Sequence, residues 1–307
     1  MLQNNSNSRQ SIVVGTRGSL LARSQTALVI SQLQQLNPGL EVQTLLISSS
    51  GDKIQDRPLH EFGGKGLFTK ELETALLAGQ IDLAVHSLKD VPVTMPLVDQ
   101  QNLCFAAIPL REDPRDILAS LKYRYISDLP QGTKVGTGSL RRRCQLLAAR
   151  PDLQVEMIRG NIDTRLRKMR EGQYDAVILA YSGVKRANLF NDKEMTPIPF
   201  ELMLPAAGQG ALLLQCRKDD TCTREIVAKM DDPTTHTCIE AERALVMALN
   251  GDCHSPIAAY ATLKGDQLTL AGALGQSDGR PPVKRGSVTG SVGSSKQLAE
   301  SLAGQLR

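Results

Sequence analysis

The chain has 307 residues, of which 41% are hydrophobic, and its formal net charge is +4 at pH 7. This length exceeds that of most single domains, so we expect two or three domains. The 36 basic residues are nearly balanced by 32 acidic ones, and the chain has no tryptophan, five phenylalanines and five tyrosines. This composition argues against a dedicated nucleic-acid binder. Such proteins are usually more basic and offer aromatic side chains for stacking.

The first ten residues are polar and do not resemble a signal peptide, and no apolar run reaches the length of a membrane span. Six cysteines are present without a single CxxC pair, which argues against a zinc site. We therefore expect a cytoplasmic protein with reduced thiols, no membrane segment and no metal.

Strands and helices alternate over the first two-thirds of the chain. Apolar runs predict strands there, and segments with helical periodicity predict helices. Two βαβ series of this kind indicate two α/β domains with mainly parallel sheets. The expected strands are 11–16, 41–48, 81–87, 134–139, 153–160 and 174–180, and the expected helices are 19–36, 66–79, 140–150, 164–172 and 182–189.

The pattern changes after residue 225. Helices are expected at 224–230 and 235–250, followed by two strands within 257–276 that turn around Lys264–Gln267. A candidate third strand lies in 282–292, and a final amphipathic helix is expected at 294–307. This part of the chain is typical of a small α+β domain.

Three strand-to-helix junctions share small polar residues and nearby arginines: GTRGSL (15–20), GTGSL (136–140) and RGNIDTR (159–165). Helix starts expose unpaired N–H groups, and small residues let an anion approach them. In a parallel sheet such loops share the carboxyl edge of the strands. Ordinary capping with solvated arginines is the better explanation for any single junction, but three junctions with the same chemistry favour a shared site for a small polyanion. The arginines concerned are Arg17, Arg141, Arg142, Arg159 and Arg165.

Three further loops carry reactive groups. Lys89 and Asp90 directly follow an apolar strand, where they form either a surface turn or part of a site. Lys65 lies in a glycine-rich entry to a helix, which is either a lid or a flexible linker. Cys253 lies among turn-forming residues rather than in an apolar run. A thiol exposed in a loop is reactive, so its presence there suggests a functional role.

The chain resembles the porphobilinogen deaminase (hydroxymethylbilane synthase) family of tetrapyrrole biosynthesis, over most of its length. The segments that carry the resemblance are, in order, GTRGSLLARSQ, GGKGLFTKELE, AVHSLKDVPV, REDPRD, VGTGSLRRRCQL, IRGNIDTRL, LPAAGQGALLLQCR and the GDC loop. The combination of HSLKDVP, SLRRRCQ and RGN followed by TR is highly specific.

The resemblance implies an enzyme that joins four porphobilinogen units head to tail, releasing ammonia each time, to give hydroxymethylbilane. It also implies a dipyrromethane cofactor, held by a thioether to the residue matching Cys253, and a catalytic aspartate at Asp90. The porphobilinogen units and the growing polypyrrole chain are the expected partners, and we expect a monomer. Because each pyrrole carries two carboxylates, an arginine-rich cleft suits this ligand without a strongly basic protein.

The resemblance also implies which residues bind the cofactor and the substrate, Asp90 through the pyrrole N–H groups, Lys65 from the active-site loop and the others through the acetate and propionate side chains. On the cofactor side these are Lys89, Asp90, Thr137, Ser139, Arg141 and Arg142; on the substrate side they are Arg17, Ser19, Lys65, Arg159, Arg165 and Arg186. Arg143 is expected to point away, toward solvent or a surface carboxylate, because consecutive helical residues project about 100° apart. Asp252 departs from the family pattern, which has glycine before the cofactor cysteine.

The implied fold has two domains like those of type II periplasmic binding proteins, and a third domain that carries the cofactor cysteine. The expected boundaries are 1–108 with 207–227 for domain 1, 109–206 for domain 2 and 228–307 for domain 3, with GQGALLLQC as the strand that returns to domain 1. Two other classes remain: a solute-binding protein for an anionic ligand, and a nucleic-acid binder built on the arginine cluster. The polar N-terminus and the third domain with its loop cysteine argue against the first, and the balanced charge argues against the second.

Overall fold

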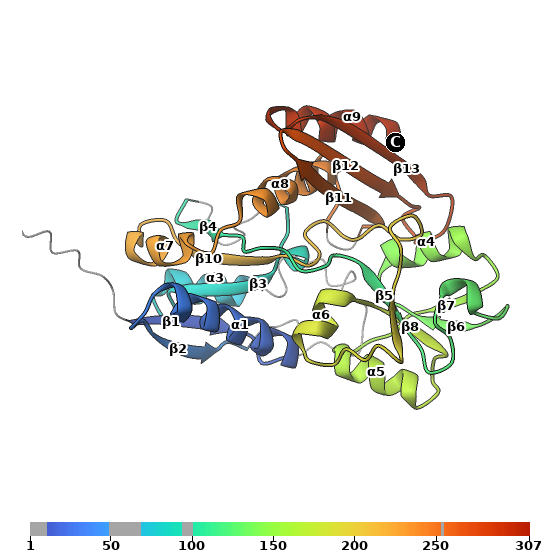
Figure 1. The fold of residues 1–307 in the computed structure, drawn as a ribbon, viewed down its shortest axis with the longest axis horizontal. Helices are drawn as coiled ribbons and strands as arrows, with labels where there is room; N and C mark the ends of the chain where they lie inside the picture. Colours follow the sequence, from blue (N-terminus) through green and yellow to red (C-terminus); the bar gives the residue numbers. More distant parts are fainter. Residues whose placement is uncertain (1–10, 49–68, 94–100, 253–254) are drawn as a thin grey trace, which may run out of the picture.

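The computed structural model describes residues 11–48, 69–93, 101–252 and 255–307, and these residues form three sheets (Figure 1). In the first sheet the strand order is β2-β1-β3-β10-β4. Four of its strands run in one direction, and only β10 opposes its neighbours. The strands are β1 (Ser11–Thr16), β2 (Glu41–Leu46), β3 (Leu83–Ser87), β4 (Leu103–Ala107) and β10 (Leu212–Arg217).

The second sheet repeats this plan with the order β7-β6-β8-β5-β9, and β5 is the opposing strand. In each sheet the opposing strand directly follows a passage of the chain from the other sheet. This plan is that of paired type II periplasmic-binding-protein-like domains. The strands are β5 (Asp116–Ala119), β6 (Lys134–Gly136), β7 (Gln154–Glu156), β8 (Ala176–Ala180) and β9 (Met195–Pro197).

Helices cover both faces of each of these sheets, because successive strand side chains point to opposite faces. In the first sheet, one face packs against α1 (Leu20–Leu36) and α7 (Thr221–Ala228), and the other against α3 (Lys70–Leu77). In the second, α4 (Leu140–Ala149) covers one face, and the other meets α5 (Ile162–Arg170) and α6 (Tyr181–Arg186). Short 3-10 turns η2 (Leu88–Asp90) and η3 (Ile126–Asp128) end strands or connect them.

The third sheet is an antiparallel meander that packs against two helices (Figure 1). Its strands are β11 (Ile257–Lys264), β12 (Gln267–Leu274) and β13 (Lys284–Ser291), and its helices are α8 (Pro233–Ala248) and α9 (Ser295–Leu306), with the turn η4 (Val292–Ser294). The expected α+β character of the C-terminal part is confirmed.

The expected α/β architecture with mainly parallel sheets is confirmed, and so is the returning strand in GQGALLLQC, which is β10. The strands β4, β5 and β9 were not predicted. We propose that the three sheets mark three domains with the boundaries expected from the sequence, 1–108 with 207–227, 109–206 and 228–307. Within the described ranges, no helix is long and apolar enough to cross a membrane.

Candidate functional site: a basic cavity between the three sheets

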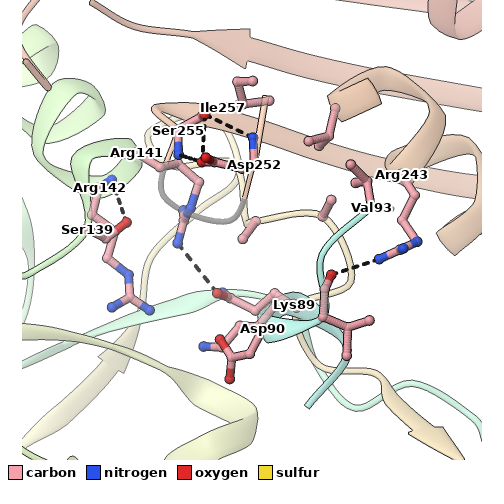
Figure 2. Close-up of a pocket in the computed structure, with 15 residues that line it drawn as sticks. Lys89, Asp90, Val93, Ser139, Arg141, Arg142, Arg243, Asp252, Ser255 and Ile257 are labelled. Carbon is pink, nitrogen blue, oxygen red and sulfur yellow. Dashed lines mark hydrogen bonds between the residues drawn. The ribbon is translucent and has the colours of Figure 1, made fainter. Parts of the chain in front are cut away.

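One cavity is lined by residues from all three sheet units (Figure 2). Figure 2 shows Lys89 and Asp90 on one side, Arg141 and Arg142 entering from α4, Arg243 from α8, and Asp252 with Ser255 opposite Asp90. The remaining lining residues are Val91, Val93, Ser139, Ala206, Ala207, Gln209, Val246 and Ile257. Segments more than a hundred residues apart therefore share one basic pocket, and of the three predicted junctions only that at 136–140, with the arginines after it, lines this cavity.

The turn that carries Lys89 and Asp90 is held in place by the segment just before β10, where the chain returns to the first sheet. Leu88 is buried, and its N–H donates to the Ala211 carbonyl at 3.1 Å. Gly208 packs against Leu88 and has a positive φ of 73°. A Cβ atom at Gly208 would lie only 2.3 Å from Leu88 Cδ2, so the close contact requires glycine. The apolar strand β3 is thus followed by a fixed turn that presents two charged groups to the cavity.

The start of α4 is capped as its sequence predicts. Ser139 is the N-cap, and its Oγ accepts from the Arg142 N–H at 3.5 Å. Thr137 is buried just before it, and its Oγ1 accepts from the Ser139 N–H at 3.2 Å. Side-chain oxygens thus satisfy two main-chain donors at this strand-to-helix junction.

The arginines at this junction are buried and already paired. Arg141 and Arg142 are 4% and 6% exposed, and both donate to Asp116, which is fully buried on β5. Gln209 adds a further donor to the same carboxylate at 2.8 Å. Although burial alone would raise it, the two guanidinium groups hold the pKa of Asp116 well below its usual range.

Asp116 was not singled out from the sequence. It lies within the quoted segment REDPRD, directly before the apolar run ILA, and a carboxylate at that place was the available signal. Its effect is to fix both guanidinium groups while cancelling part of their charge. The cavity therefore presents two oriented arginines rather than a diffuse basic patch.

Arg143 turns away from this pair, as expected, but not into solvent. It is half-buried against Gly279 of the loop between β12 and β13, and its Nε has no hydrogen-bond partner. No carboxylate in the described part of the chain lies within ion-pair distance of it.

Lys89 has an unusual electrostatic environment. Burial lowers its pKa to about 8, with Arg142 and Arg141 acting in the same direction and Asp90 in the opposite one. The lysine therefore lies within electrostatic reach of the aspartate beside it and of both paired arginines. A ligand carboxylate entering this pocket would favour the charged form of the lysine.

Arg17 also lies near Asp90. A small cavity is lined by both residues, together with His86, Ser87 and Gln25. Ser19 caps α1, and its Oγ accepts from the Ala22 N–H at 3.3 Å. The first junction therefore adjoins the pocket from the side of the first sheet.

Arg159 and Arg165 approach from the second sheet. Burial lowers the pKa of Arg165 to about 10, with Arg142 and Arg159 acting in the same direction and Asp90 in the opposite one. Its Nε donates to the Gly160 carbonyl at 2.7 Å. Arg165 therefore lies within electrostatic reach of Arg142 and Asp90.

Arg186 is not among the residues that line the cavity. Its Nη2 donates to the Gly210 carbonyl at 2.7 Å, and its Nε is buried without a hydrogen-bond partner. It therefore lies beside the passage of the chain between the two sheets, with one donor unused.

Lys65 and Cys253 lie outside the described residues. The chain on either side of Cys253 is described as far as Asp252 and from Ser255 onward. The Ser255 N–H donates to Asp252 Oδ1 at 2.9 Å, and the Asp252 N–H donates to Ser255 Oγ at 3.0 Å. Both residues line the cavity, so they place the two ends of the cysteine-bearing turn at its wall.

Two family models match the chain. The first, "Porphobilinogen deaminase, dipyromethane cofactor binding domain", covers residues 12–225, and the second, "Porphobilinogen deaminase, C-terminal domain", covers 236–307. The chain belongs to the porphobilinogen deaminase family. This membership favours an enzyme over the solute-binding and nucleic-acid-binding classes.

Curated relatives in the porphobilinogen deaminase family match nearly the whole chain. The porphobilinogen deaminase of Geobacter sulfurreducens is 47% identical over 293 residues, which cover 95% of this chain and 90% of the relative. That of Roseiflexus sp. is 45% identical and covers 97% of each chain. Among solved structures, the methionine binding protein MetQ is similar with a TM-score of 0.43 and 13% identity, covering 72% of this chain and 89% of its own.

The cavity suits the dipyrromethane cofactor of the porphobilinogen deaminase family. That group carries four carboxylates on two pyrroles, and the cavity offers the cationic side chains of Lys89, Arg141, Arg142 and Arg243. Asp90 adds an acceptor suited to pyrrole N–H groups. The termini of the turn that holds Cys253 lie at the same wall.

Proposed function

We propose that the chain is a transferase that condenses four porphobilinogen molecules head to tail into hydroxymethylbilane, and that its dipyrromethane cofactor is attached to Cys253 by a thioether. The main support is one observation: Lys89, Asp90 and the paired arginines share a cavity whose wall includes Asp252 and Ser255, on either side of Cys253. When bound, the cofactor supplies the pyrrole carbon from which the chain grows.

Asp90 is proposed as the catalytic residue. Its carboxylate accepts hydrogen bonds from pyrrole N–H groups and stabilises the cationic azafulvene that porphobilinogen becomes when it loses ammonia. Asp90 ends the half-buried turn η2, which fixes its backbone and so limits the reorganisation needed as charge develops.

The basic residues are proposed to bind carboxylates in two groups. Lys89, Arg141 and Arg142, with the hydroxyls of Thr137 and Ser139, bind the cofactor. Arg17, Ser19, Arg159, Arg165 and Arg186, together with Lys65, bind the incoming substrate and the growing chain. The support for the second group is that Arg17 lines a small cavity together with Asp90, that Asp90 acts electrostatically on Arg165, and that Arg186 has an unused Nε beside the passage between the sheets, whereas Lys65 rests on the resemblance alone.

Intact-mass measurement tests the attachment. The purified chain is expected to exceed its sequence mass by one dipyrromethane, and Cys253→Ser to lose that excess. As a matched control, Cys222→Ser removes a half-exposed thiol on α7 and should retain the excess mass. An unmodified wild-type chain that still makes hydroxymethylbilane would refute the assignment.

A monomeric state and a cytoplasmic location are also proposed. Their support is the resemblance and, for the location, the five cysteines that are free in the described part of the chain. Light scattering of the purified chain at micromolar concentration tests the first, and fractionation of the source cells tests the second.

A further inference from the structure

Arg243 on α8 contacts the main chain directly after Asp90, a contact that the function proposed above does not use. Its Nη1 donates to the Val91 carbonyl at 3.0 Å and its Nη2 to the Pro92 carbonyl at 2.7 Å. Figure 2 shows the guanidinium group of Arg243 reaching toward the chain between Asp90 and Val93. The guanidinium carbon also lies 5.5 Å from the centre of the Phe105 ring. One side chain thus joins the C-terminal unit to the turn that carries Asp90.

This turn needs such a partner because it is short. The 3-10 helix η2 has three residues, and the bond from the Val91 N–H to the Leu88 carbonyl at 3.0 Å closes its end. Carbonyls at the end of a helical turn have no partner within it, and a cationic side chain satisfies them well. Ala211 holds the beginning of the turn through Leu88, and Arg243 holds its end.

Arg243 keeps its charge without a carboxylate partner. Burial lowers its pKa to about 10, so it stays a cation at neutral pH. Across the described ranges no acidic side chain lies within ion-pair distance of it. Its directed contacts are therefore the two carbonyls and the aromatic face, which fix the guanidinium plane against the turn.

The same helix also holds the beginning of the turn that contains Cys253. At its end, the Gly251 N–H donates to the Val246 carbonyl at 2.9 Å, and Val246 lies three residues after Arg243 on the same face of the helix. Glu242 is fully buried next to Arg243 and accepts from the Gly208 N–H at 2.7 Å and the Ala261 N–H at 2.9 Å. The segment of α8 between the two turns is therefore firmly anchored.

We propose that Arg243 is a positioning residue for the reaction: it sets the Asp90 carboxylate at a fixed distance from the cofactor-bearing turn. This inference rests on the roles proposed for Asp90 and Cys253. Because α8 contacts both turns within about one helical turn of its length, a loose contact at Arg243 displaces Asp90 relative to the group on which it acts. Misplacement of a catalytic group lowers the rate even when binding survives.

A purely structural role is the alternative, and Arg285 provides the matched control. Arg285 on β13 also joins the C-terminal unit to a neighbouring loop through two carbonyls, those of Phe200 at 2.7 Å and Leu202 at 3.3 Å. It does not line the cavity. A lysine at either position keeps the charge but cannot donate to two carbonyls in the same fork.

The test compares Arg243→Lys with Arg285→Lys by kcat and KM for porphobilinogen, thermal unfolding midpoint and intact mass. We expect Arg243→Lys to carry the full cofactor mass, to keep KM within about threefold, and to lose kcat by about 10- to 100-fold, the effect of one charged hydrogen bond. Arg285→Lys should lower the unfolding midpoint similarly while kcat stays within about threefold.

Two results overturn the proposal. If both variants keep kcat while losing stability, Arg243 only joins the domains. If Arg243→Lys lacks the cofactor mass, the residue acts in cofactor loading rather than in positioning. A failure of the proposed function is distinguishable, because it appears in the wild-type mass and in Asp90→Ala, neither of which involves Arg243.

Discussion

Asp116 Oδ1 accepts two hydrogen bonds from Arg142, from Nε at 3.1 Å and from Nη2 at 2.8 Å, inside a region from which solvent is excluded. Arg141 reaches the other carboxylate oxygen at 2.8 Å. The protein itself thus holds the two guanidinium groups that line the cavity. Each arginine therefore has two separate roles to test: its ion pair with Asp116 stabilises the fold, and its position at the cavity is proposed to bind the cofactor.

Replacing Asp116 with asparagine should destabilise the protein strongly. The change leaves two buried guanidinium groups without their anion, and breaking a buried pair from one side typically costs about 3–5 kcal/mol. Asp113→Asn is the control, because Asp113 and its partner Arg115 are 22% and 39% exposed and such pairs contribute about 1 kcal/mol or less. Chemical denaturation measures both. Equal losses would show that Asp116 is not a structural anchor.

The three consecutive arginines should separate by function. Arg141→Leu and Arg142→Leu remove charged hydrogen bonds near the cofactor, each worth about 1.5–3 kcal/mol, and should block cofactor loading or chain growth. Arg143→Leu should leave turnover within a few-fold of wild type, since Arg143 packs against Gly279. Intact mass and native-gel separation of chain-length intermediates measure these effects. Similar behaviour of all three variants would contradict the carboxylate-clamp interpretation.

Asp90→Ala should fold and bind yet scarcely turn over. Loss of one group that stabilises developing charge costs roughly 10²–10³ in rate. Asp90→Glu is the companion variant, since it retains a carboxylate on a longer arm and should recover part of the rate. Single-turnover kinetics with porphobilinogen measure the chemical step. Near-normal turnover of the alanine variant would show that the charge is stabilised elsewhere.

The stability of the protein should fall in mild acid partly because of His86. The side chain is 5% exposed on β3, bonded to Gln215 at 2.9 Å, and burial lowers its pKa to about 4 from 6.5. The unfolded chain therefore binds a proton more readily, so this contribution is complete above pH 6.5 and is lost as the pH falls toward 4.

Urea denaturation between pH 4 and 7 measures this contribution. His86→Gln should flatten the pH dependence, while His236→Gln, a change at the half-exposed histidine of α8, should leave it in place. An unchanged slope in His86→Gln would assign the acid sensitivity to other groups.

The main elements were predictable because their signals are local. The cap at Ser19 and the apolar period after it predict α1, and the run after residue 81 predicts β3. The strands β5 and β9 were missed since they have only four and three residues, and β9 ends in proline. Such short segments become strands only through pairing with β8 and with each other.

In the candidate site too, the residues with local sequence signals were predictable and those that depend on long-range packing were not. Lys89 and Asp90 follow β3 of the first sheet and Arg141 and Arg142 follow β6 of the second, so the cavity lies where the carboxyl ends of strands from two different sheets face each other. The partnership of Asp116 with those arginines was not predictable, since it joins residues 25 and 26 positions apart through a strand that was itself missed. The contacts of Arg243 depend on how α8 packs against the first sheet, which no local pattern specifies.

The place of β10 in the first sheet has a consequence for synthesis on the ribosome. β10 lies between β3 and β4 and pairs with both, so β4 is joined to the rest of its sheet only through β10. Residues 212–217 emerge after the whole of the second sheet has been made. The nascent chain must therefore keep the edge of β3 and the strand β4 apart from other partners for about a hundred residues. We expect this edge to be a preferred binding site for chaperones on the nascent chain, and the second sheet to fold first.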